Sequence, residues 1–213
     1  MFRKLAGLAV VASLFFAGSA FAGVITGSAH DFSGTTWTAE VCQVCHAPHN
    51  NVATTGLLWN HADPGSTYIP YSNPNTMSSA PGAPTGTSKL CLSCHDGQIN
   101  VDAYGGGAGT VDIDTFNTAA NMGLDLQNDH PISFDYPTPA VDPEMNDSAA
   151  PNLVTIGEDG QAVTGSIAAL MLDGQSVECQ SCHDVHNTTA VAGTKLLLID
   201  NANSDLCLAC HAK

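Results

Sequence analysis

The segment CQVCH at residues 42–46 sets a pattern that organises the whole chain. The same Cys-x-x-Cys-His pattern returns as CLSCH at 91–95, as CQSCH at 179–183 and as CLACH at 207–211. The four motifs use all eight cysteines of the 213-residue chain, and a histidine follows directly after every second cysteine. Such regular spacing indicates that each motif performs the same chemical task.

Cys-x-x-Cys-His is the signature of covalent c-type haem attachment. The two thiols add to the two vinyl groups of one macrocycle, and the imidazole that follows becomes the proximal ligand of the iron. The sequence therefore predicts four haem c groups. The predicted attachment residues are Cys42, Cys45, Cys91, Cys94, Cys179, Cys182, Cys207 and Cys210. The predicted proximal ligands are His46, His95, His183 and His211.

Three other uses of paired cysteines compete with this interpretation. Structural zinc takes Cys₄ or Cys₃His sets, exported chains use cysteines for disulfides, and Cys-x-x-Cys alone can be a thioredoxin-like redox pair. None of these needs a histidine directly after every second cysteine. The same arrangement in all four pairs favours haem attachment over the three alternatives.

Residues 1–22 have the pattern of a secretory signal peptide. A positively charged start at 2–4 precedes an apolar run at 5–16, and Ala-Phe-Ala at 20–22 is a small-residue cleavage site. The apolar run is too short to span a bilayer comfortably. We therefore expect a mature chain of residues 23–213 without a membrane span. It is expected to be secreted and to act outside the cell or at its surface, with the periplasm as transit or alternative location.

The charge of the predicted mature chain excludes several partners. It contains three lysines, no arginine and 20 acidic residues, which gives a formal charge of −17. Nucleic acids and anionic lipid surfaces both bind through clusters of cationic side chains, so neither is expected as a partner. A strongly negative surface favours cationic or metal-bearing partners.

The apolar inventory is thin, with 7 Phe, 4 Tyr and 2 Trp set among 11 Pro and 20 Gly. A core made of side chains alone would be marginal at this length. We therefore expect a multihaem c-type cytochrome fold that is mostly irregular coil, with short helices at the haem motifs and the haems forming the core. Residues 153–156 and 161–164 flank a Gly-Glu-Asp-Gly turn and predict one small hairpin.

An internal repeat divides the chain into two dihaem halves, at roughly residues 23–100 and 125–213. In each half the first motif is followed three residues later by another histidine, and the second motif is preceded by leucine. A further histidine stands upstream of the motifs in each half. The stretch between the second and third motifs contains no haem motif and reads mainly as loops.

The repeat also selects the candidate distal ligands. Five of the nine histidines lie outside the haem motifs, and four of them have a counterpart in the other half. These four predicted distal ligands are His30, His49, His130 and His186. His61 has no counterpart and is predicted to stay outside the ligand set. Bis-histidine ligation at all four irons implies low reduction potentials, since thioether ligation raises them.

The positions of His49 and His186 constrain the haem arrangement. Each lies only three residues after a proximal histidine, and two imidazoles that close in the chain cannot straddle one porphyrin plane. Each must therefore bind the iron of a different haem, which brings two haems into close contact. We expect the first haem to pair with the second, and the third with the fourth.

Taken together, these motifs resemble the tetrahaem extracellular cytochromes of metal-reducing bacteria, of the OmcE type. The segments that carry the resemblance are GVITGSAHD (23–31), CHAPHN (45–50), WN (59–60), SKLCLSCHDG (88–97), DHPISF (129–134) and LCLACH (206–211). The resemblance implies a head-to-tail homopolymer, a filament with a continuous chain of haems. Residues 104–128 and 141–172 carry no motif that takes part in it.

Three functions compete. The first is a conduit that carries electrons outside the cell to metal oxides or partner cytochromes, and the second is a soluble periplasmic electron shuttle. The third is a multihaem reductase, which needs one iron with an open distal site and cationic groups for an anionic substrate. Because there are enough histidines for all four irons and no arginine in the mature chain, we do not expect an enzyme.

The contact between subunits of such a filament stays open at this point. His30 lies close to the mature N-terminus among small, turn-prone residues, so it is a candidate for donation to a haem of the neighbouring subunit. The alternative, in which His30 binds a haem of its own chain, is at least as compatible with the sequence.

Overall fold

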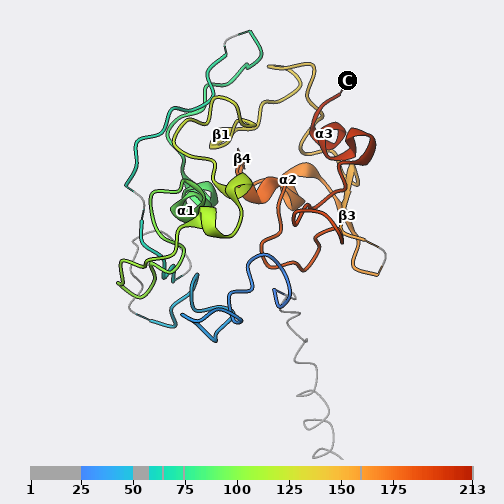
Figure 1. Ribbon diagram of the computed structural model, residues 1–213. Coiled ribbons are helices and arrows are strands. Elements are labelled where there is room, and N and C mark those ends of the chain that lie inside the picture. The colour runs from blue at the N-terminus through green and yellow to red at the C-terminus, as the bar shows by residue number, and fades with distance from the viewer. Residues whose placement is uncertain (1–24, 50–57, 64, 74, 159, 213) are drawn as a thin grey trace, which may run out of the picture.

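The computed structural model describes residues 25–49, 58–63, 65–73, 75–158 and 160–212. Turns and loops dominate, and the regular elements are short (Figure 1). None of the helices within these ranges has the length and apolar character needed to cross a bilayer. The predicted signal peptide lies outside the described residues.

The regular elements follow one another in an order that alternates helical turns and short strands. The α-helices are α1 (Gly86–His95), α2 (Ile167–Leu170) and α3 (Asp205–Cys210). The 3-10 helices are η2 (Ile113–Thr115), η3 (Thr118–Ala120), η4 (Cys179–Ser181) and η5 (Ala202–Ser204). The strands are β1 (Phe134–Asp135), β2 (Val154–Ile156), β3 (Val163–Gly165) and β4 (Ser176–Val177).

Each haem motif closes a single helical turn. The second motif ends α1 and the fourth occupies α3, whereas the third begins on the shorter η4. The first motif is a turn without a helix, in which the His46 N–H donates to the Cys42 carbonyl over 2.8 Å. The same bond recurs from His183 to Cys179 at 3.1 Å. The expected short helices at the motifs are therefore present at three motifs, and one turn replaces the helix at the first.

The predicted hairpin is confirmed. Strands β2 and β3 pair antiparallel, with Val154 opposite Gly165 and Ile156 opposite Val163. Val154 and Ile156 are buried while Thr155 between them is exposed, as expected where alternate side chains point to opposite faces. A second pairing, between β1 and β4, was not predicted because each strand has only two residues. This pairing joins the segment after His130 to the residues that come just before the third haem motif.

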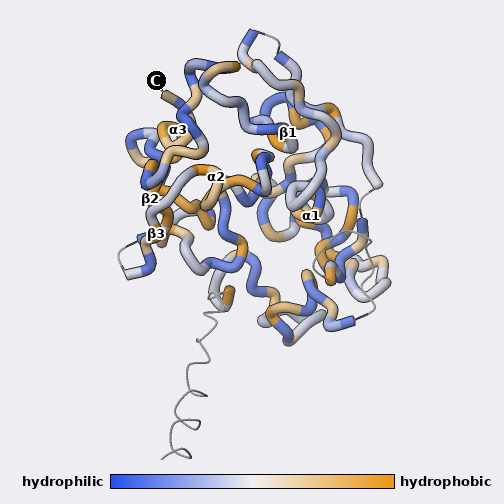
Figure 2. Tube along the Cα trace, turned by 180° about the vertical axis from the view of Figure 1, so that it is seen from behind, coloured by the Kyte–Doolittle hydropathy of each residue, from blue (hydrophilic) through white to orange (hydrophobic). Residues whose placement is uncertain are grey.

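A small hydrophobic core lies in the C-terminal half. It consists of Tyr136, Val154, Ile156, Ile167, Met171, Val177 and Leu198. Orange, apolar stretches gather around α2, β2 and β3 in Figure 2. The expectation that haems alone would form the core was therefore incomplete. These apolar residues are spread over some sixty positions with no strong periodicity, so the sequence did not reveal that they converge.

We expect Ile167→Ala to destabilise this core measurably. Ile167 is completely buried, and truncating such a side chain typically costs about 2–5 kcal/mol of unfolding free energy. Denaturant unfolding of the haem-loaded protein, followed by far-UV circular dichroism, measures the loss. Val163→Ala is the control, because Val163 is 43% exposed. Equal losses in the two variants would show that the C-terminal cluster does not stabilise the fold.

Candidate haem sites

Two of the predicted proximal histidines are held by backbone carbonyls. The Nδ1–H of His95 donates to the Ala120 carbonyl over 2.8 Å, and that of His183 donates to the Lys195 carbonyl over 2.8 Å. Because a carbonyl only accepts, these bonds fix the proton on Nδ1 and leave Nε2 as the nitrogen with a lone pair. This is the usual arrangement around a metal-binding histidine.

His186 lies against the first haem motif. Its ring is stacked on that of His46, with centroids 6.2 Å apart and planes 13° apart. Trp59 meets the same His46 ring edge-on at 6.3 Å. The expected pairing of the first with the second haem, and of the third with the fourth, stays a prediction, whereas this ring contact favours a pairing of the third motif with the first. Neighbours in sequence are therefore a poor guide to neighbours in space.

His30 lies beside the second motif of its own chain. Its ring centroid is 6.1 Å from that of His95, with an angle of 66° between the planes. Its Nδ1 is buried and has no hydrogen-bond partner. Burial, together with the nearby His95, His183 and His186, lowers the pKa of His30 to about 4. The imidazole is therefore neutral at neutral pH, which is the form that binds metals.

Each of the two histidine pairs brings two imidazoles within a distance at which both could reach one iron. With metal–nitrogen bonds of about 2 Å, two imidazoles on opposite sides of one metal have centroids about 6 Å apart. The separations of 6.2 Å for His46 with His186 and 6.1 Å for His30 with His95 agree with this value. In addition, the Nδ1 of His30 is buried and forms no hydrogen bond with the protein, which is unusual for a buried polar atom. The chain's own residues thus suit a haem iron at each pair.

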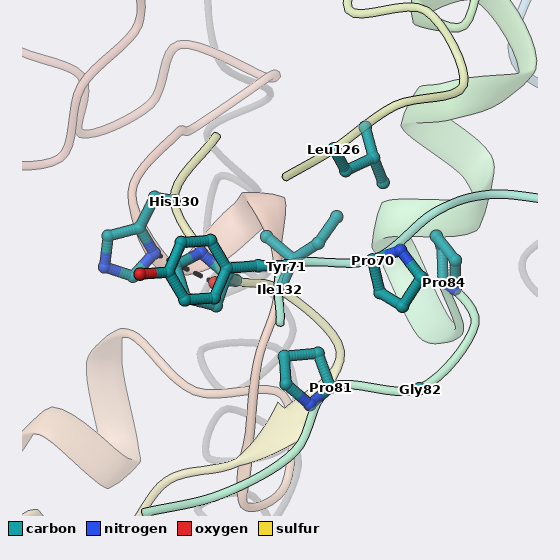
Figure 3. Close-up of a pocket in the computed structure, with 9 residues that line it drawn as sticks. Pro70, Tyr71, Pro81, Gly82, Pro84, Leu126, His130 and Ile132 are labelled. Atoms are coloured by element: carbon teal, nitrogen blue, oxygen red, sulfur yellow. Dashed lines mark hydrogen bonds between the residues drawn. The ribbon is translucent and has the colours of Figure 1, made fainter. Parts of the chain in front are cut away.

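The other two predicted distal ligands, His49 and His130, are exposed to solvent, as is His186. His49 lies on the surface three residues after His46. His130 donates its Nδ1–H to the Pro131 carbonyl over 2.9 Å, which leaves Nε2 with a lone pair, as in the two anchored proximal histidines. Figure 3 shows His130 beside Tyr71 at the rim of a small apolar pocket that Pro70 also lines. Neither His49 nor His130 is paired with a proximal histidine among the ring contacts of the described residues.

His61, the histidine without a counterpart, is fully buried beside the second motif. Its Nε2 lies 3.0 Å from the Asn100 carbonyl and 3.4 Å from the Cys94 sulfur. Its Nδ1 lies 3.4 Å from the Ala62 carbonyl. Burial lowers the pKa of His61. Both ring nitrogens face backbone carbonyls, so His61 packs against the second motif instead of pairing with another histidine.

Burial raises the pKa of several cysteine thiols. It raises the pKa of Cys45, Cys182 and Cys210 to about 11 each, and that of Cys94 to about 12. Cys179 is the exception, because its hydrogen bond with the Cys91 thiol outweighs burial and lowers its pKa to about 7. All eight cysteines belong to the described residues and none forms a disulfide. The described residues also contain no group of three or more His, Cys, Asp or Glu side chains that could hold a metal ion, as a zinc site requires.

The second and third motifs meet through their first cysteines. A hydrogen bond with Cys179, together with burial, raises the pKa of Cys91 well above its usual value. Close by, the Cys179 N–H donates to Ser88 Oγ over 3.0 Å. Because Ser88 belongs to α1 and Cys179 begins η4, these two helical turns are locked together at the point where both would carry a haem.

Asp184 organises the turn that carries His186, and sequence reasoning missed it. Its carboxylate accepts the N–H of His186 at 3.0 Å, and both the N–H and the hydroxyl of Thr188 at 2.6 Å. Thr189 donates its N–H to the same oxygen at 2.7 Å. Burial raises the pKa of Asp184, but these hydrogen bonds outweigh it and lower the pKa overall. The sequence contained a signal for this role, because the residue after the proximal histidine is Ala47 in the first motif and Asp184 in the third.

Comparison with known proteins supports the haem interpretation. The chain matches the family model of a doubled CXXCH motif over residues 173–213, which contain the third and fourth motifs. No curated protein matches the chain. The doubled motif indicates covalently bound c-type haem and the electron transfer of multihaem c-type cytochromes. The structure agrees with this class, since it is mostly coil with short helices and two small sheets.

Removing the Asp184 carboxylate should loosen His186. In Asp184→Ala the turn loses several charge-assisted hydrogen bonds, each worth about 1.5–3 kcal/mol. We expect one iron per chain to become partly high-spin and to bind carbon monoxide when reduced, as measured by electron spin resonance and visible spectroscopy. Asp200→Ala is the matched control, because Asp200 accepts the Ala202 N–H in a similar turn without a nearby distal histidine. Unchanged spectra for Asp184→Ala would contradict this role.

Proposed function

We propose that the protein is a tetrahaem c-type cytochrome that transfers electrons outside the cell and polymerises into a filament of the OmcE type. The observation that carries the proposal is the central position of the third motif, which lies near all three others. The Cys-x-x-Cys-His sequences would each hold one haem, and a bound haem supplies a one-electron iron couple. What the chain itself contributes is the spacing and order of the attachment points.

The third motif makes a different connection to each of the others. His186, at its end, stacks on His46 of the first motif. The thiol of Cys179, at its beginning, forms a hydrogen bond with the thiol of Cys91 in the second motif. Cys182 lies close enough to Cys207 of the fourth motif for the two thiols to interact electrostatically. Residues 179–186 therefore supply a hub through which electrons could pass between all four attachment points.

The ring contacts support one assignment of the distal ligands. In this proposal His186 completes the first site with His46, and His30 completes the second site with His95. The internal repeat then assigns His49 to the third site and His130 to the fourth. The first and third motifs thereby exchange distal histidines, so neither half can complete its sites without the other. His30 serves its own chain in this assignment, rather than a neighbouring subunit.

The outer motifs support end-to-end contact between subunits. In Figure 1 the N-terminal segment with the first motif lies at the bottom, whereas α3 with the fourth motif lies at the upper right, and α1 lies between. Cys42 of the first motif and Cys207 of the fourth are exposed. A head-to-tail contact that does not close produces an open filament. The charge of the mature chain opposes such a contact at low salt, so polymerisation requires screening or bound cations.

A soluble periplasmic shuttle is the second candidate, because the same arrangement of motifs would serve it without polymerisation. A multihaem reductase has less support, since the proposed ligand set fills both axial positions of every iron. Negative-stain microscopy of material sheared from cells separates the first two. Filaments that contain this chain support the conduit, and only dispersed protein in a haem-loaded preparation would favour the shuttle.

The ligand assignment makes a direct spectroscopic prediction. His186→Ala should convert one of four low-spin irons to a form that binds carbon monoxide when reduced, because it removes the ring opposite His46. His61→Ala should leave four low-spin irons, because His61 faces backbone carbonyls. Electron spin resonance of the oxidised protein counts the low-spin irons. Loss of a low-spin iron in His61→Ala, or no change in His186→Ala, would reverse the assignment.

A further inference from the structure

Asp96 is an acidic residue in an unusual place. It directly follows His95 at the C-terminal end of α1, and its side chain is 0% exposed. Among the described residues the one salt bridge joins Lys89 to Asp63, so it leaves Asp96 without a cationic partner. Burying a carboxylate without a cation is costly unless donors surround it. Because burying this carboxylate costs free energy, we expect it to have a role at this position.

The surroundings of Asp96 are those of an anion. Ser66 and Tyr68 donate their hydroxyls to Oδ2 over 2.9 and 2.8 Å, and the Gln98 N–H donates to Oδ1 over 2.8 Å. Burial and the Asp96 carboxylate raise the pKa of Tyr68, which keeps the phenol protonated as a donor. Every partner donates, and a carboxylate anion accepts at both oxygens. A negative charge is thus fixed beside the second motif.

Glu178 is a second buried carboxylate, and it lies beside the third motif. It directly precedes Cys179 and is 3% exposed. Ser133 donates its hydroxyl to Oε2 over 2.9 Å, and Thr85 donates its hydroxyl to Oε1 over 3.3 Å. Gly86, the first residue of α1, has a φ of 49°, and a Cβ there would lie 3.1 Å from Oε1. The carboxylate therefore sits at the positive N-terminal end of α1, which stabilises it.

The fields of both carboxylates reach haem-attaching cysteines. Asp96 is among the groups that raise the pKa of Cys94, after burial and Cys45. Glu178 also acts to raise the pKa of Cys179, although the hydrogen bond with Cys91 outweighs it and lowers that pKa to about 7. In the first motif the pKa of Cys45 is raised by burial and by Cys42, and no carboxylate contributes. In the fourth motif the groups that act on Cys210 are burial, two cysteines and Tyr136. Asp96 and Glu178 are the fully buried carboxylates of the described residues, and they flank the second and third motifs.

We propose that Asp96 and Glu178 hold the second and third haems at lower reduction potentials than the first and fourth. This inference rests on the proposed function, in which each motif binds one haem. An oxidised iron carries one more positive charge than a reduced iron, so a nearby fixed anion favours the oxidised state. Buried charges are screened far less than exposed ones, so the many surface carboxylates have little such effect. Potentials of c-type haems respond to this kind of local charge and burial.

The test is a redox titration of the haem-loaded protein with dithionite as the electron donor, one electron per iron. The wild-type protein should show two lower and two higher midpoint potentials. Asp96→Asn should raise one of the two lower values, and Glu178→Gln should raise the other. We expect each redox equilibrium constant to change at least tenfold, which is about 59 mV for a one-electron couple. The shifts should persist in about 1 M salt, because screening acts mainly on exposed charges.

Two controls separate charge from structure. Asp112→Asn removes an exposed carboxylate but keeps a side-chain oxygen that can accept the Asp114 N–H, so its potentials should match the wild type in high salt. Tyr68→Phe removes one donor from Asp96 while the carboxylate stays, so the affected potential should fall or stay constant. If the buried carboxylates acted only by holding loops in place, Tyr68→Phe and Asp96→Asn would shift the potential in the same direction.

Several results would overturn the inference. These are a rise of a higher potential in place of a lower one, no shift in Asp96→Asn and Glu178→Gln, or an upward shift in Tyr68→Phe. Four low-spin irons in each variant show that the sites remain intact, so a missing shift then counts against the carboxylates alone. Fewer than four haems in the wild-type protein would instead contradict the proposed function. If Asp96→Asn fails to incorporate haem, Glu178→Gln and Tyr68→Phe still decide the question.

Discussion

The contact between α1 and η4 is the constraint on which the rest of the structure depends. Ser88 of α1 accepts the Cys179 N–H, and Thr85 at the start of α1 donates to Glu178. The free thiols of Cys91 and Cys179 lie close enough to shift each other's pKa. These groups are buried or partly buried, so their hydrogen bonds compete little with water. Because α1 ends in the second haem motif and η4 begins the third, this one contact fixes how the two halves of the chain meet.

The histidine arrangement follows from that junction. Once the third motif is held against the second, the turn organised by Asp184 carries His186 to His46, and His30 lies between the same motifs. Several imidazoles then gather in one region, where His95, His183 and His186 add to burial in lowering the pKa of His30. The protein alone leaves the Nδ1 of His30 unpartnered. Such a cluster makes physical sense when metal ions take up the imidazole lone pairs.

The sequence alone predicted the local chemistry of the motifs better than it predicted which motifs lie next to each other in the fold. The spacing of the cysteines predicted the attachment sites and the short helical turns, because both depend on neighbouring residues, and the Gly-Glu-Asp-Gly turn between residues 153–156 and 161–164 predicted the hairpin. Which motif His186 reaches depends instead on contacts between distant segments, such as β1 with β4 and α1 with η4. The roles of Asp96 and Glu178 were equally hidden, since acidic residues in a strongly acidic chain are expected on the surface.

The distribution of charge also bears on how such a chain could conduct. Most of the 20 acidic residues are exposed, where salt screens them, and they chiefly affect solubility and contacts between subunits. Asp96 and Glu178 differ because the fold removes them from water and surrounds them with donors. The junction between the two halves thus places two buried negative charges at the middle of the proposed electron path. An electron entering at either outer motif would then meet a rise in energy at the centre, so that the fold, rather than the haem chemistry alone, shapes the path along the chain.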